Sequence, residues 1–229
     1  MRSSRWQAQG NVYLVADGDA LTPERVRAEV GDADGILEVR GAGDDWVDIA
    51  IWNPDGSLAE MSGNGTRIAA RWLAERTGAD RVAVRVGTRE VVARIRDDGL
   101  VEQDLGEVRV GAAEEVEGVR FAPVDVGNPH AVVEGDPAEL PRIGPLLETH
   151  PRFPQRTNVQ VARRVGDAEI EARVWERGVG ETGSSGTSAV AVAAALAMSP
   201  ATVRFPGGEL TVRIANGRAF LTGPAERVD

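Results

Sequence analysis

The stretch Glu60-Met61-Ser62-Gly63-Asn64-Gly65-Thr66 decides the fold, because it places a glycine-rich turn directly before a helical segment at 67–76 that ends near Gly78. Two glycines around an asparagine let the backbone approach a ligand closely. The following helix offers unpaired N–H groups, which favour an anion such as a carboxylate or phosphate. The same residue types also form an ordinary N-cap and turn, so this motif alone leaves both interpretations open.

A second stretch of the same design lies in the other half of the chain. Glu181-Thr182-Gly183-Ser184-Ser185-Gly186-Thr187-Ser188 precedes an alanine-rich segment at 189–198 that predicts a helix. Ser62 and Ser185 are 123 residues apart, close to half of the 229-residue chain. This spacing indicates an internal repeat, in which each loop would bind one end or one face of a small acidic molecule.

Around these two loops the pattern is a mixture of strands and short helices. Thr22-Pro23-Glu24 is a typical helix start, and residues 46–52 are typical of a strand, as are residues 157–162 and 169–175 in the second half. Residues 111–120 are acidic and lack hydrophobic periodicity. We therefore predict an N-terminal half at 1–112 and a C-terminal half at 113–229, with the last strand, near 218–229, returning to the first half.

The composition excludes several classes of chemistry. The 26 basic residues are all arginine against 36 acidic residues, which gives a net charge of −10, and there is no cysteine and no lysine. Without lysine there is no Schiff base to pyridoxal phosphate and no Walker-type phosphate loop. Without cysteine there is no thiolate catalysis, disulfide or Cys-ligated zinc, and the two histidines make a His-rich metal site improbable.

Charge and hydropathy also indicate where the protein acts. The acidic balance argues against nucleic-acid binding, which draws on clustered positive charge. No apolar run is long enough for a signal peptide or a transmembrane span, so we expect a cytoplasmic protein without a membrane partner.

Further motifs have two interpretations each. Residues 178–183 match the dinucleotide fingerprint, but fewer than 50 residues follow and Glu181 would face the pyrophosphate, so we set that interpretation aside. Ser185 does not form a Gly-x-Ser-x-Gly motif. Glu176-Arg177 could bind the ammonium and carboxylate of an amino acid or form an exposed pair. His130 could act as a base or as a packing residue.

Taken together, these blocks resemble the diaminopimelate epimerase family, whose members work without pyridoxal phosphate. The resemblance runs along nearly the whole chain, although the region before Trp46 is shorter than the family pattern. The blocks that carry it are residues 9–13, 53–57, 60–65, 127–132, 157–159, 175–182 and 185–187. The family implies an α+β fold of two pseudo-symmetric halves, each a curled, mostly antiparallel sheet around a central helix.

The resemblance also implies roles for individual residues, with no cofactor and no metal. It predicts an amino-acid substrate and a possible homodimer. The amides of five asparagines would bind the two amino-acid ends of the substrate: Asn11, Asn53, Asn64, Asn128 and Asn158. Gly63 and the backbone of Gly186 and Thr187 would hold the reacting carboxylate, and Arg177 would bind a carboxylate. His130 and Glu176 would assist at the reacting carbon.

The sequence differs from the family pattern at the positions of the two acid–base groups. Family members use one cysteine to remove the α-proton and a second to return one on the opposite face, and the matching positions here are Ser62 and Ser185. A thiol has a pKa of about 8.5, whereas an alcohol is a weaker acid by several units, each unit costing about 1.4 kcal/mol.

Three interpretations follow from that departure. The chain is a serine-containing epimerase that interconverts LL- and meso-diaminopimelate; or a relative catalysing proton abstraction with elimination, such as hydroxyproline dehydration; or a non-catalytic binding homologue, natural or engineered. We place the two-base epimerase first because the recognition residues are present, with Glu176 or His130 helping to activate each serine.

Overall fold

The computed structural model describes residues 2–18, 20–59 and 61–228, so Glu60 of the first motif lies outside the described residues. The chain divides into two units, residues 1–104 with 222–229, and residues 105–221. Each unit is described here by itself.

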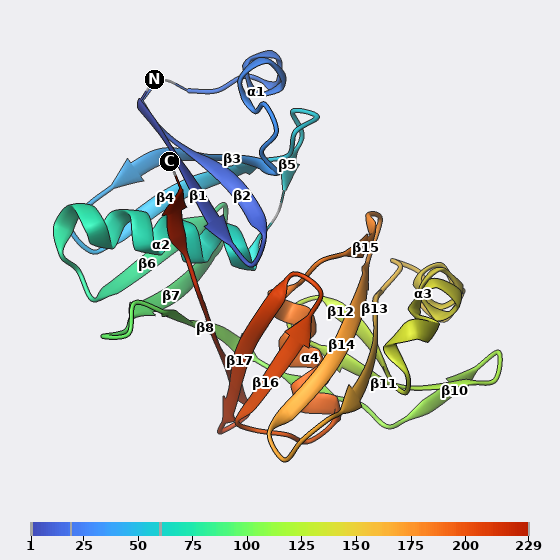
Figure 1. The fold of residues 1–229 in the computed structure, drawn as a ribbon. Helices are drawn as coiled ribbons and strands as arrows, with labels where there is room; N and C mark the ends of the chain where they lie inside the picture. The colour runs from blue at the N-terminus through green and yellow to red at the C-terminus, as the bar shows by residue number, and fades with distance from the viewer. Residues whose placement is uncertain (1, 19, 60, 229) are drawn as a thin grey trace. The chain divides into compact units, whose positions relative to one another are not determined.

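In unit 1, strands wrap around one long helix (Figure 1). The elements of this unit are β1 (Arg2–Ala8), β2 (Asn11–Asp17), α1 (Pro23–Glu29), β3 (Gly35–Ala42), β4 (Trp46–Trp52), β5 (Leu58–Ala59), α2 (Gly63–Thr77), β6 (Arg81–Val86), β7 (Arg89–Ile95) and β19 (Glu226–Val228). β8 (Val101–Glu107) begins in this unit and ends in the next. The sheet joins β1–β2, β3–β4, β6–β7 and β7–β8 antiparallel, and β2–β3 and β4–β6 parallel.

Unit 2 repeats this path. Its elements are β9 (Arg109–Val110), β10 (Glu114–Val116), β11 (Val119–Asp125), β12 (Pro129–Glu134), a 3-10 turn (Pro137–Glu139), α3 (Leu140–Glu148), β13 (Asn158–Arg164), β14 (Glu169–Glu176), β15 (Gly180–Thr182), α4 (Gly186–Ala195), β16 (Ala201–Phe205), β17 (Gly208–Ala215) and β18 (Arg218–Gly223). The pairs β11–β12, β13–β14 and β16–β17 are antiparallel, whereas β12–β13 and β14–β16 are parallel.

The order of antiparallel and parallel pairs is therefore the same in both units. α1 and α3 lie in equivalent crossovers between parallel strands, and α2 and α4 lie in the next crossovers. The predicted α+β class with two pseudo-symmetric halves, each a mostly antiparallel sheet around a central helix, is confirmed.

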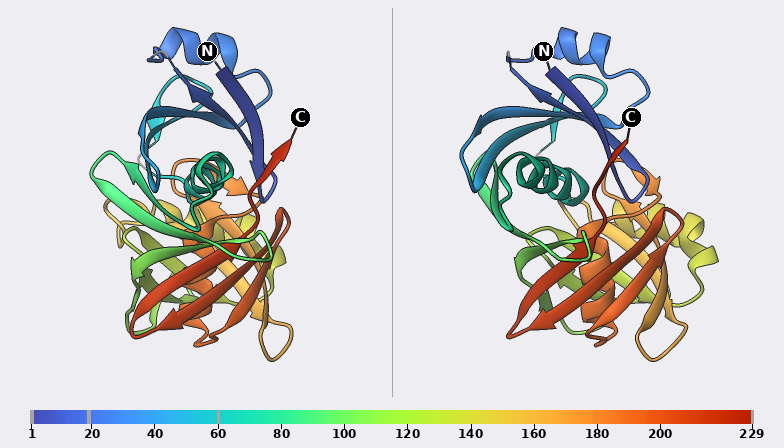
Figure 2. Two further views of the ribbon diagram at one scale, coloured as in Figure 1. Left: turned by 90° about the vertical axis from the view of Figure 1, so that its left-hand side faces the viewer. Right: turned by 60° about the vertical axis from the view of Figure 1, so that its left-hand side comes forward.

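The central helix of unit 2 is apolar on nearly every side, whereas the central helix of unit 1 buries one face and also carries Arg67, Arg71, Glu75 and Arg76. α4 contributes Ala189 to Ala193 to the core of unit 2, each with no exposed surface. α2 contributes Ile68, Ala69, Ala70, Trp72 and Leu73 to the core of unit 1. Figure 2 shows α2 nearly end-on, within the curve of its strands. A helix apolar all round, such as α4, is stable only when it is surrounded by other elements.

The division between the units differs from the boundary at 112/113 that the sequence predicts. It falls at 104/105, because β9 pairs with β11 and residues 105–112 therefore belong with the second unit. Residues 222–229 belong to unit 1, where β19 pairs with β1. In the part of the chain that the structure describes, no helix is long and apolar enough to cross a membrane.

Candidate functional site

Ser62 caps the central helix of unit 1. Its backbone is extended (φ −140°, ψ 118°), and its Oγ accepts the Gly65 N–H at 3.0 Å. A Cβ on Gly65 would lie 3.2 Å from the Ser62 Cβ and 3.1 Å from Leu37, so a glycine here leaves the cap room to form. The Ser62 hydroxyl also lies 3.2 Å from the Tyr13 hydroxyl. Ser62 is thus fixed at the positive end of α2.

Hydrogen bonds link the side chains of Arg67, Asn64 and Asn11 at the start of α2. Arg67 is fully buried, and burial lowers its pKa to about 10. Its guanidinium can only donate, so the Asn64 Oδ1 that it contacts must accept, and Asn64 Nδ2 then donates to Asn11 Oδ1. The Asn11 amide nitrogen is thereby left to donate to another acceptor, such as a carboxylate.

Ser185 caps the central helix of unit 2 in the same extended conformation (φ −149°, ψ 130°), but its side chain makes no cap hydrogen bond. Its hydroxyl bonds instead to the carboxylate of Glu176, which also accepts the Thr182 hydroxyl at 2.6 Å. Burial raises the pKa of Glu176, although both hydroxyl bonds act in the opposite direction. A carboxylate with a raised pKa is a stronger base than an ordinary one.

His130 lies on β12 and is almost fully buried, with 1% exposed. Its Nδ1 lies 3.0 Å from the Gln160 amide nitrogen, a donor, so Nδ1 accepts and the proton is assigned to Nε2, which donates to Asn128 Oδ1 at 2.9 Å. Burial first, then the charge of Arg177, lowers the pKa of His130 to about 3. The ring is neutral and orients Asn128, and its assistance at the reacting carbon stays a prediction.

The other predicted asparagines are engaged differently. Asn158 joins two loops of unit 2, because its Nδ2 donates to the Pro129 carbonyl at 3.0 Å and its Oδ1 accepts the Arg177 N–H at 3.0 Å. Asn53 hydrogen-bonds within its own turn, to Ser57 Oγ at 2.9 Å. Asn158 therefore holds the backbone of Arg177, while Asn53 orders a local turn.

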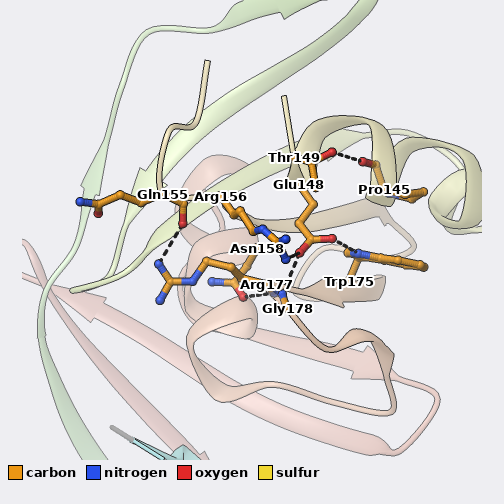
Figure 3. A network of polar contacts seen from close by, with 9 residues as sticks. All are labelled: Pro145, Glu148, Thr149, Gln155, Arg156, Asn158, Trp175, Arg177 and Gly178. Carbon is orange, nitrogen blue, oxygen red and sulfur yellow. Dashed lines mark hydrogen bonds and ion pairs between the residues drawn. The ribbon is translucent and has the colours of Figure 1, made fainter. Parts of the chain in front are cut away.

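A buried carboxylate holds the turn that carries Glu176 and Arg177 (Figure 3). Glu148, the last residue of α3, accepts the Trp175 indole N–H at 2.8 Å and the Gly178 N–H at 2.7 Å. Burial favours the neutral acid, but these two bonds and the charge of Arg156 outweigh it and lower the pKa of Glu148. A Cβ on Gly144 would lie 2.8 Å from the Trp175 ring, so the indole packs against helix α3 where that residue has no side chain.

The predicted residues thus form one cluster in each unit. Unit 1 brings together Asn11, Ser62, Gly63 and Asn64. Unit 2 brings together Asn128, His130, Asn158, Glu176, Arg177, Ser185, Gly186 and Thr187. Sequence reasoning missed Tyr13, Glu148 and Gln160, whose partners lie 27 to 49 residues away. Among the described residues, no group of three or more His, Asp or Glu is placed to hold a metal ion.

Comparison with solved structures first establishes the fold. The chain superposes on solved structures of a predicted epimerase from Pseudomonas aeruginosa (TM-score 0.70, 17% identity, 99% of this chain and 98% of that one). It also superposes on a hydroxyproline epimerase from Agrobacterium vitis (TM-score 0.66, 17% identity, 99% and 90%). At these identities the likeness establishes the fold, which epimerases share.

The family model of diaminopimelate epimerase matches residues 15–111 and 122–228. A diaminopimelate epimerase of Synechococcus is 37% identical, covering 96% of this chain and 94% of the relative, and one of Thermobifida fusca is 44% identical, covering 76% and 68%. The chain belongs to the diaminopimelate epimerase family. The first alignment spans 271 residues, more than the 229 of this chain, so the relative contains segments that this chain lacks.

Proposed function

We propose that this protein is a cofactor-independent isomerase that inverts an α-carbon of diaminopimelate, interconverting the LL and meso forms. The observation that supports this most directly is the repeat. Each unit has a serine at the N-terminus of its central helix, and the family resemblance matches these two positions to its acid–base cysteines. Inversion needs one base and one acid, and each unit supplies one hydroxyl.

The helix termini suit the intermediate of this reaction. Removing the α-proton moves negative charge onto the substrate carboxylate, and the free N–H groups at the start of a helix stabilise such charge. In the proposal, the backbone of Gly63 supplies these donors in unit 1, and the backbone of Gly186 and Thr187 supplies them in unit 2. Arg177 and the Asn11–Asn64 pair bind carboxylates.

Activation of the serines is the demanding step. On the unit 2 side, Ser185 donates its proton to Glu176 as it accepts the α-proton, so Glu176 becomes a neutral acid, the negative charge moves to the substrate and no alkoxide forms. The reverse transfer returns a proton to carbon. An amino-acid substrate, a homodimer and a cytoplasmic location belong to the same proposal and rest on the family resemblance.

Isotope exchange tests the function directly. The protein is incubated with LL-diaminopimelate in deuterated water, and the expected product is meso-diaminopimelate carrying one α-deuterium. Absence of exchange at high enzyme concentration would overturn the proposal, and substrate binding retained in calorimetry would then identify a binding homologue.

Restoring thiols at both sites tests the placement of the serines. Ser62→Cys combined with Ser185→Cys should raise the epimerisation rate about 10-fold or more, because thiols ionise several pKa units below alcohols. The rate of the double variant in the same deuterium assay is the measurement. An unchanged rate would mean that the serines are not the acid–base groups.

A further inference from the structure

The phenol of Tyr13 meets Ser62 at the start of α2. Tyr13 lies on β2 and is the only tyrosine of the chain, and its hydroxyl is 3.2 Å from Ser62 Oγ. Nothing in the reaction described above uses this group. The inference drawn from it rests on the proposed function, because it concerns how Ser62 moves a proton.

The ring of Tyr13 is held where its hydroxyl can reach Ser62. Tyr13 pairs with Gly35 in the parallel ladder between β2 and β3. A Cβ at Gly35 would lie 2.9 Å from Tyr13 Cε1 and 2.4 Å from the Trp52 carbonyl, so no side chain fits at that position. The phenol therefore packs over a glycine that the fold requires.

The neighbouring hydrogen bond sets the direction of proton donation. The Gly65 N–H donates to Ser62 Oγ, which therefore acts as the acceptor in that bond. The hydroxyl hydrogen of Ser62 is then free to point at the Tyr13 oxygen. This is the arrangement needed to pass a proton from Ser62 to Tyr13.

We propose that Tyr13 is the relay partner of Ser62. As Ser62 Oγ accepts the α-proton, it passes its own hydrogen to the Tyr13 phenolate, so the C–H bond breaks, two O–H bonds form and one O–H bond breaks. The negative charge moves from the phenolate to the substrate. In the reverse direction Tyr13 donates to Ser62 as Ser62 protonates the carbon, which regenerates the phenolate.

The ordinary pKa values of the groups involved favour this relay over a bare alkoxide at Ser62. A phenol has a pKa of about 10 and a thiol one of about 8.5, whereas an alcohol is a weaker acid than the thiol by several units. Passing the proton through Ser62 to Tyr13 makes the effective base a phenolate. The disadvantage against a cysteine then falls to about 1.5 pKa units.

A paired set of variants tests the relay. Tyr13→Phe keeps the ring over Gly35 and removes only the oxygen, and it is made with Ser62 intact and in the Ser62→Cys background. With Ser62 intact, we expect kcat/KM to fall at least 30-fold. In the Ser62→Cys background we expect the loss of kcat/KM caused by Tyr13→Phe to be at least 10-fold smaller than with Ser62 intact, because a thiol ionises without a phenol. Equal losses in the two backgrounds would overturn the relay.

The pH dependence gives an independent readout. Because Tyr13 is the only tyrosine, its ionisation can be followed by near-ultraviolet difference absorbance. Inversion needs one group ionised and the other protonated, so we expect kcat/KM to fall at alkaline pH as Tyr13 loses its proton, and this fall to be missing in Tyr13→Phe. An alkaline fall with the same midpoint in Tyr13→Phe contradicts the relay. If the unsubstituted protein exchanges deuterium and Tyr13→Phe exchanges it at the same rate, the relay is wrong but the proposed function stands. If the unsubstituted protein shows no exchange, the proposed function itself is wrong.

Discussion

The two serine loops occupy equivalent positions in the repeat but have different partners. Ser62 accepts a helix N–H and meets a phenol, whereas Ser185 makes no cap bond and contacts a carboxylate. The backbone angles of the two caps agree within about 12°, so the scaffold is the same and the difference lies in the side chains.

This contrast shows how one motif can serve two chemical tasks. Burial raises the pKa of the Glu176 carboxyl, which makes its carboxylate a stronger base than an ordinary one, while an ordinary phenol is ionised only at alkaline pH. The side of Ser185 is therefore the more readily activated one. The two units also differ in how firmly the serine is tied to its helix, since only Ser62 accepts a cap bond.

The largest effect is expected at Glu176. Glu176→Gln keeps the size of the side chain but removes the proton acceptor of Ser185, and general-base catalysis contributes about 10²- to 10⁴-fold. We expect kcat to fall by at least 10²-fold in the deuterium assay, more than for Tyr13→Phe. Glu181→Gln is the matched control, because Glu181 pairs with Arg173 at 2.7 Å and not with Ser185. A smaller loss at Glu176 than at Tyr13 would reverse the assignment of the stronger base.

Among the described residues, each unit buries one basic side chain, Arg67 on α2 and His130 on β12, and the two should respond differently to acid. Arg67, at a pKa of about 10, stays charged below neutral pH, whereas His130 is neutral with a pKa of about 3. The pKa of His130 in the folded state lies below its unfolded value of about 6.5, so its contribution to stability is present above pH 6.5 and is lost as the pH falls toward 3.

Urea unfolding at pH 7 and pH 4 measures this loss. At pH 4 the protonation of unfolded His130 should cost up to about 3 kcal/mol of unfolding free energy. His130→Gln removes the titrating group, so its free energy should fall less between the two pH values than that of the unsubstituted protein. His150→Gln is the control, since His150 lies in a partly exposed turn. Parallel losses in the unsubstituted protein and in His130→Gln would contradict the burial of a neutral ring.

The sequence predicted the repeat from its two loops, and it predicted strand β4 to the residue. It placed the start of α2 at 67, whereas the helix begins at Gly63, because Gly63 and Gly65 have low helix propensity and are typical of a loop. Here the Ser62 cap and the burial of Asn64 and Thr66 outweigh propensity.

The partners of the site were harder to predict. Tyr13 reaches Ser62 across 49 residues, and Glu148 reaches Trp175 across 27. No local periodicity encodes such contacts, because they depend on which strands pair. The same holds for His130, whose burial next to Gln160 decides between a packing residue and an accessible base.

A third effect concerns the turn that gives unit 2 its charged groups. In Glu148→Gln the amide nitrogen must face either the Trp175 N–H or the Gly178 N–H, and a buried donor left without an acceptor costs about 1–3 kcal/mol. We expect KM to rise about 5- to 10-fold as Arg177 loosens, with kcat changed less than 3-fold. Glu139→Gln, on an exposed ion pair with Arg142 in the same region, should leave KM unchanged. A fall in kcat at unchanged KM would argue against this positioning role.

The smallest effect separates the two helix caps themselves. Ser62→Ala removes the acceptor of the Gly65 N–H, and loss of such a cap costs about 1 kcal/mol of unfolding free energy. Ser185→Ala removes no cap bond, so in a Glu176→Gln background, where the charged partner of its hydroxyl is also gone, we expect it to cost less than half as much. Urea unfolding of both variants at pH 7, with each transition fitted separately if the two units unfold apart, measures the difference. Equal losses would mean that Ser185 caps α4 as Ser62 caps α2, and the contrast between the loops would then rest on Tyr13 and Glu176 alone.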